Sequence, residues 1–66
     1  MEFIEKAKIR IDHWIHHNDH HCEEYEMFAE QLEEAGKKES AGYVKEMIGL
    51  TSKSTKCLSK ALEALE

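Results

Sequence analysis

Apolar residues recur with helical spacing along the first half of the chain, and no proline interrupts them anywhere in its 66 residues. Without proline, the helical hydrogen-bond ladder meets no ring clash and no missing donor. Counted as heptads, the apolar stripe combines a positions (Ile4, Ile11, Asn18, Tyr25, Leu32), d positions (Ala7, Trp14, His21, Phe28, Ala35) and e positions (Ile15, Cys22, Ala29). This pattern predicts a helix over about residues 2–35, a rod of roughly 45 Å.

A second helical period follows a predicted turn. Gly36 ends the first pattern, and glycine readily adopts the left-handed conformation that closes a helix C-terminus. We expect the turn at residues 36–38 and a second helix over residues 39–65. Its apolar series is Tyr43, Met47, Leu50, Ser54, Cys57, Ala61 and Leu65, flanked by Val44, Thr51, Leu58 and Leu62. So short a connection makes the helices antiparallel neighbours, and the predicted fold is an all-α two-helix hairpin that forms one domain.

The antiparallel register predicts which residues face each other across the hairpin. Leu32 should lie near Tyr43, Tyr25 near Leu50, and Asn18 near Cys57. The two cysteines, Cys22 and Cys57, would then lie about one helical turn apart, beyond the Cα separation of about 7 Å that a disulfide spans. We therefore expect reduced thiols.

Two helices cannot enclose apolar surfaces this wide. We expect the aromatic residues of the first helix to be core, yet a lone hairpin would leave a set of large residues partly in water: Trp14, Ile15, Phe28, Met47, Leu58 and Leu62. A second copy of the chain would cover them. The pattern therefore predicts a homodimer that forms a four-helix bundle.

Composition excludes several classes of protein. Hydrophobic residues make up 41% and charged residues 35% of the chain, and no apolar run approaches the roughly 20 residues of a membrane-spanning helix. The formal net charge of −5 argues against nucleic acid or anionic lipid as partner, since both need clustered lysine and arginine. The first residues lack the basic start and apolar stretch of a secretion signal. We expect a soluble, cytoplasmic protein.

Five histidines fall within nine residues, and they are the strongest functional lead: His13, His16, His17, His20 and His21. On a helix, residues four apart lie one above the other, so two imidazoles at that spacing can reach one metal ion. Three pairs meet this rule: His13/His17, His16/His20 and His17/His21. A structural zinc site needs four ligands and a catalytic site three plus water, so one helix supplies too few.

A second subunit is the best source of the missing ligands, because the second helix carries no histidine. Nickel, zinc and copper all accept imidazole. We rank His17/His21 first, since this pair lies at the edge of the apolar stripe, where neighbours such as Asn18 or Glu24 can orient the rings. The alternative is a solvated polar face, or, for His21, a hydrogen-bonded interior histidine.

The segment His13-Trp14-x-x-His17-Asn18-x-x-His21 resembles that of a group of short, uncharacterised prokaryotic helical-hairpin proteins with the motif H-W-x-x-H-N-x-x-H. The resemblance covers most of the chain. It implies a helical hairpin and makes His13, His17 and His21 the motif histidines. It implies no activity.

Two functions fit these features. The first is a small metal-binding protein for storage, buffering or delivery of a transition ion. The second is a protein-interaction or scaffolding dimer whose histidines decorate the surface. We expect no enzymatic activity, because the sequence has no phosphate loop or nucleophile motif and a hairpin lacks volume for a substrate pocket of about 300 Å³.

Overall fold

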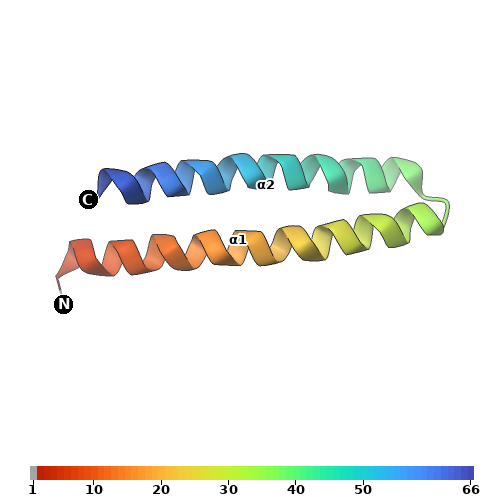
Figure 1. Cartoon of the computed structure of the whole chain (residues 1–66). Helices are drawn as coiled ribbons and strands as arrows, with labels where there is room; N and C mark the ends of the chain where they lie inside the picture. Colours follow the sequence, from red (N-terminus) through yellow and green to blue (C-terminus); the bar gives the residue numbers. More distant parts are fainter. Residues whose placement is uncertain (1) are drawn as a thin grey trace.

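The computed structural model describes residues 2–66 as two long helices, α1 (Phe3–Glu34) and α2 (Lys38–Ala64). The helices run antiparallel and lie side by side along their length, joined at one end by a short turn (Figure 1). The predicted all-α hairpin is thereby confirmed. The molecule is a rod with principal extents of 51 × 17 × 11 Å.

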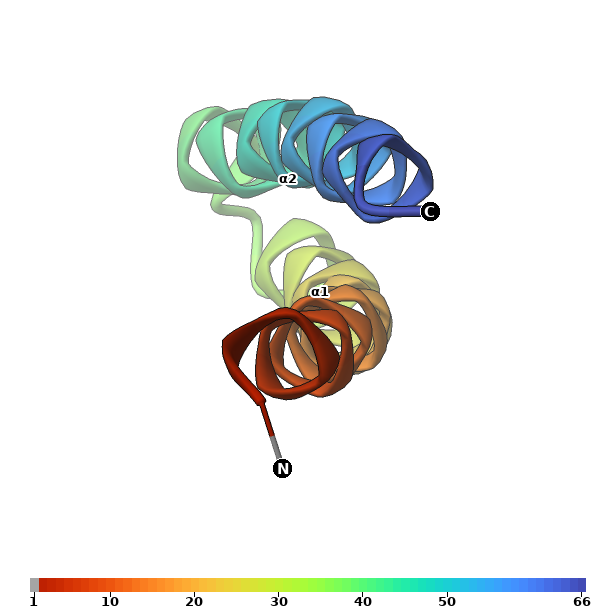
Figure 2. The same ribbon diagram turned by 90° about the vertical axis from the view of Figure 1, so that its left-hand side faces the viewer.

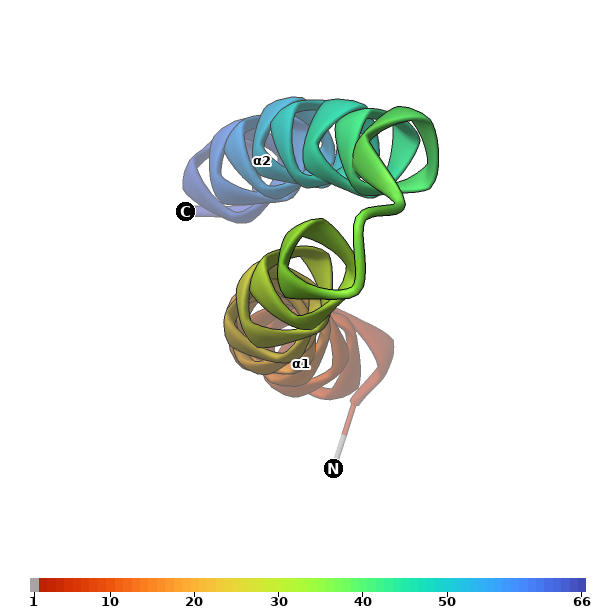
Figure 3. The same cartoon turned by 90° about the vertical axis from the view of Figure 1, so that its right-hand side faces the viewer.

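The turn closes on Gly36, as predicted. Its φ of +80° is the left-handed conformation, the one positive φ among residues 2–66. The backbone N–H of Lys37 donates to the carbonyl of Leu32 at 2.8 Å, and that of Gly36 donates to Glu33 at 3.0 Å. These two bonds form a Schellman motif, which satisfies carbonyls that the end of α1 would otherwise leave unpaired. The chain then reverses direction, and α2 begins at Lys38, directly after Lys37 (Figure 3).

The two helices meet along one face of each. Most of the less exposed positions recur every three or four residues: Ile11, Ile15, Asn18, Cys22, Tyr25, Ala29 and Leu32 on α1, and Ala41, Val44, Ile48, Thr51, Thr55, Leu58 and Leu62 on α2, with Leu65 directly after it. Within residues 2–66 only Ala29 and Ala41 are fully buried, each 1% exposed. Their small side chains lie near the turn end of the hairpin. Viewed end on, the two helices lie next to each other in a single layer (Figure 2).

The face that α2 presents to α1 differs from the predicted one. Tyr43 is 67% exposed and Leu50 60%, and Cys57 is also exposed, so they do not face Leu32, Tyr25 and Asn18 as expected. The residues that do face α1 follow them by one position in the sequence. One residue corresponds to about 100° of rotation around the helix axis. The predicted stripe on α2 therefore lies beside the observed contact face and not on it.

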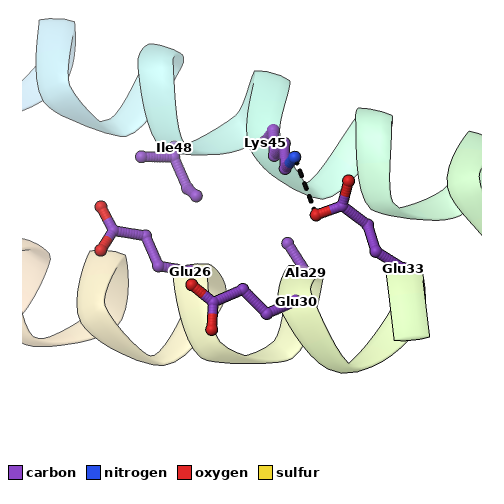
Figure 4. Close-up of a pocket in the computed structure, with 6 residues that line it drawn as sticks. All are labelled: Glu26, Ala29, Glu30, Glu33, Lys45 and Ile48. Atoms are coloured by element: carbon purple, nitrogen blue, oxygen red, sulfur yellow. Dashed lines mark ion pairs between the residues drawn. The ribbon is translucent and has the colours of Figure 1, made fainter. Parts of the chain in front are cut away.

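The axial register, in contrast, lies within one turn of the predicted one. Lys45 Nζ lies 2.9 Å from Glu33 Oε1, and this ion pair joins the helices near the turn (Figure 4). The predicted register placed Glu33 three residues away, near Gly42. Only the rotation of α2 about its own axis was wrong.

On α1 the a and e positions face α2, which leaves the d positions at the edge. Trp14 is therefore 47% exposed and Phe28 53%, as expected for these two residues in a lone hairpin. Tyr25 is half-buried, and both cysteines are free. Neither of the two helices has an apolar stretch long enough to cross a membrane.

Candidate functional site

The five histidines lie on the middle of α1, and the structure brings two of them into contact. The Nε2 atoms of His17 and His21 are 2.7 Å apart. Their ring centroids are separated by 4.3 Å and the planes stand at 86° to each other. The four-residue spacing on a continuous helix produces this arrangement, because it stacks the two side chains one turn apart. We call these two residues the histidine pair.

Two neighbours hold the His21 ring. Its Nδ1 lies 3.3 Å from Glu24 Oε1, and the Tyr25 ring lies nearly parallel to it at an angle of 8° with centroids 5.7 Å apart. A carboxylate at Nδ1 selects the tautomer that carries its proton there. In that tautomer, Nε2 of His21 would accept a hydrogen bond from the Nε2–H group of His17.

The other three histidines point elsewhere. His16 Nε2 lies 3.5 Å from Asp12 Oδ2, and His20 Nε2 lies 3.7 Å from Glu24 Oε1. Both side chains are more than 70% exposed, so these contacts with carboxylates are weak. The ring of His13 lies 6.0 Å from that of His17, centroid to centroid. The three pairs that satisfy the spacing rule are therefore not equivalent, and only the histidine pair has its nitrogens together.

A single chain supplies only two clustered ligands. Across residues 2–66, no group of three or more histidine, cysteine or acidic side chains comes together in a way that could hold a metal ion. Cys22 is half-buried on the face toward α2. Burial raises the pKa of its thiol, and the nearby charges of Asp19 and Glu26 raise it further. The thiolate that would bind a metal is thus disfavoured.

The histidine pair lies beside an exposed apolar surface. The ion pair between Glu33 and Lys45 marks one side of the hairpin, where a shallow groove is lined with charged side chains (Figure 4). The helical spacing places a set of exposed apolar side chains from both helices on the other side of the hairpin, away from this ion pair. This apolar flank consists of Trp14 and Phe28 on α1 and Tyr43, Met47 and Leu50 on α2.

Tyr25, which the sequence predicts to be a core residue beside the histidines, is half-buried and stacks its ring on that of His21. The spacing of four residues between the two rings was the available signal.

Comparison with known proteins gives one match. Residues 7–65 match a protein-family model described as Domain of unknown function (DUF8180). The matched range includes all five histidines and nearly all of both helices. No curated protein and no solved structure matches the chain.

Proposed function

The chain belongs to the DUF8180 family, a domain of unknown function, and we propose that it is a small protein that binds a transition-metal ion through His17 and His21. The role would be storage, buffering or delivery of the ion. The observation that carries the proposal is the 2.7 Å separation of the two Nε2 atoms.

This separation is close to what a shared ion requires. Zinc bonds to imidazole nitrogen at about 2.0–2.1 Å, so two ligands at a tetrahedral angle lie about 3.3 Å apart. The histidine pair would have to open by about 0.6 Å, which small side-chain rotations provide. In exchange, the His17 ring would take the tautomer that carries its proton on Nδ1, and the Nε2 lone pairs of both rings would point at the ion. Nickel and copper accept imidazole as zinc does.

Glu24 supports the same assignment. A metal-bound histidine commonly donates its other ring nitrogen to a carboxylate, which fixes the ring and strengthens the ligand. The contact of 3.3 Å between His21 Nδ1 and Glu24 Oε1 has this form. His16 and His20, in contrast, have carboxylates beside Nε2 itself.

Isothermal titration of the untagged protein with nickel, copper and zinc tests the proposal. The test variant carries His17→Ala and His21→Ala, and the matched control carries His16→Ala and His20→Ala, which removes two imidazoles at the same spacing. We expect the test variant to lose tight binding and the control to keep it. Equal binding by both variants would overturn the proposal.

A protein-interaction or scaffolding role is the second candidate, and the apolar flank is the observation that favours it. In that case the histidines are surface groups. The melting temperature would then be the same with and without a chelator, and substitutions on the apolar flank rather than at the histidine pair would abolish association.

A further inference from the structure

We infer that the metal ion is held between two copies of this chain, whose α1 helices pack antiparallel on the apolar flank so that their two histidine pairs form one four-imidazole site. The inference rests on the proposed function and deepens it. It commits to a second copy as the occupant of the apolar flank and to a ratio of one ion for two chains.

The number of ligands is the first reason. The histidine pair gives two nitrogens, and nothing else in residues 2–66 joins them as a third ligand. Two pairs together give four, the number that a closed zinc site requires. The site is therefore incomplete in one chain and complete in two.

The surface of the hairpin is the second reason. A compact protein of 7.7 kDa exposes about 4,300 Å². This chain exposes 5273 Å², an excess of roughly 1,000 Å². A partner in a stable interface typically covers about 800 Å² of each protein. The radius of gyration also indicates an extended shape with excess surface, because it is 15.4 Å where about 11 Å is usual for this length.

The two sides of the hairpin differ in chemistry, and this difference indicates which side a second copy covers. One side carries charged groups, including Glu26, Glu30 and the ion pair of Glu33 with Lys45. The other is the apolar flank, and it runs beside the histidine pair. A second copy on the apolar flank buries aromatic and aliphatic side chains and brings a second set of imidazoles to the same surface.

Charge decides the orientation. The first half of α1, residues 3–18, has three basic and two acidic side chains, whereas the second half, residues 19–34, has seven acidic and no basic ones. Parallel packing of two α1 helices would set the acidic halves against each other. Antiparallel packing sets each acidic half against the half that carries Lys6 and Arg10, which is favourable.

Antiparallel packing also determines where along α1 the metal site lies. The midpoint of α1 falls between Asn18 and Asp19, within the span of His17 to His21. When His17 of each copy lies level with His21 of the other, the two α1 helices overlap along their length with their ends offset by only one residue. Arg10 then lies four residues, about 6 Å along the helix axis, from Glu24 of the second copy. The two-fold axis passes through the ion.

Sedimentation equilibrium and native mass spectrometry with Zn²⁺ test the inference. The unaltered chain should form a dimer that holds one zinc ion. Phe28→Ala, at an exposed position, should raise the dimer dissociation constant about tenfold or more. Circular dichroism would show that its helices remain. The inference is overturned if zinc binds to a monomer, one ion for each chain, in a manner that depends on the histidine pair. That result would leave the proposed function standing, whereas binding that ignores the histidine pair would remove both.

A charge reversal tests the orientation. Arg10→Glu should weaken the zinc-bound dimer about tenfold, because it places a second acidic group near Glu24 of the other copy, twice in each dimer. In a parallel dimer the two substituted side chains would lie level with each other, so one like-charge pair would replace another and association would stay nearly unchanged. Lys53→Glu, the same reversal on an exposed lysine away from the apolar flank, is the control and should leave the dimer unchanged. An unchanged or strengthened dimer with Arg10→Glu would overturn the antiparallel arrangement.

Discussion

The same substitution, glycine to alanine, should have opposite effects at two positions of this hairpin. Gly36 closes α1 with a φ of +80°, and no described atom lies within 4 Å of an added Cβ. The cost there is therefore purely conformational, about 1–2 kcal/mol for a left-handed residue with a side chain. The more restricted unfolded chain returns about 0.4–1 kcal/mol of this. We expect a net loss of about 1 kcal/mol for Gly36→Ala.

Gly49 lies inside α2, and an added Cβ there also meets no described atom within 4 Å. In a helix interior, alanine is more favourable than glycine by about 1 kcal/mol. We expect Gly49→Ala to raise the free energy of unfolding by that amount. For a domain of this size, 1 kcal/mol moves the melting temperature by about 4–8 °C, so the two variants should melt roughly 8–16 °C apart.

Thermal unfolding followed by far-ultraviolet circular dichroism provides the assay. All samples need one chain concentration and the same chelator, because association and metal binding both shift the midpoint. An unchanged or higher melting temperature for Gly36→Ala would refute the left-handed turn. A lower one for Gly49→Ala would mean that another surface approaches α2 at this position.

Three further outcomes follow from the site and its surroundings. At pH 8, iodoacetamide should modify Cys57 faster than Cys22, because Cys57 is exposed whereas burial and nearby charges raise the pKa of Cys22; peptide mass mapping gives both rates, and equal rates would contradict the burial. Zinc at about 100 times its dissociation constant should add about 2.7 kcal/mol to the unfolding free energy, and EDTA should reverse the gain; a chelator-insensitive melting curve would count against metal binding. Glu24→Gln should weaken zinc binding about 10- to 100-fold in calorimetry, since it removes the carboxylate at His21 Nδ1, and an unchanged affinity would show that the contact has no role.

The fold class was predictable because it depends on local signals. A helical apolar period, the lack of proline and one glycine at the end of the first period determine two helices and a tight turn. The contact face of α2 was not predictable in the same way. Two apolar stripes run along this helix one residue apart, and periodicity alone does not say which of them meets α1. Close packing near Ala29 and Ala41 accompanies the arrangement that the structure adopts.

The candidate site, like the fold, was predictable from the sequence only in part. Spacing along the helix identifies which histidines can meet, and His17 and His21 do meet. The same spacing applies to His16 and His20, whose rings instead lie beside Asp12 and Glu24. This difference depends on side-chain rotamers and on where carboxylates fall one turn away, which a spacing rule does not contain. Metal binding itself stays a prediction.

Anomalous diffraction from crystals grown with zinc tests the central proposal most directly. We expect a peak at the zinc absorption edge about 2.0–2.1 Å from Nε2 of both His17 and His21. A peak on His13, His16 or His20 without the histidine pair, or crystals that bind no zinc while His17 and His21 keep their nitrogens in contact, would contradict it.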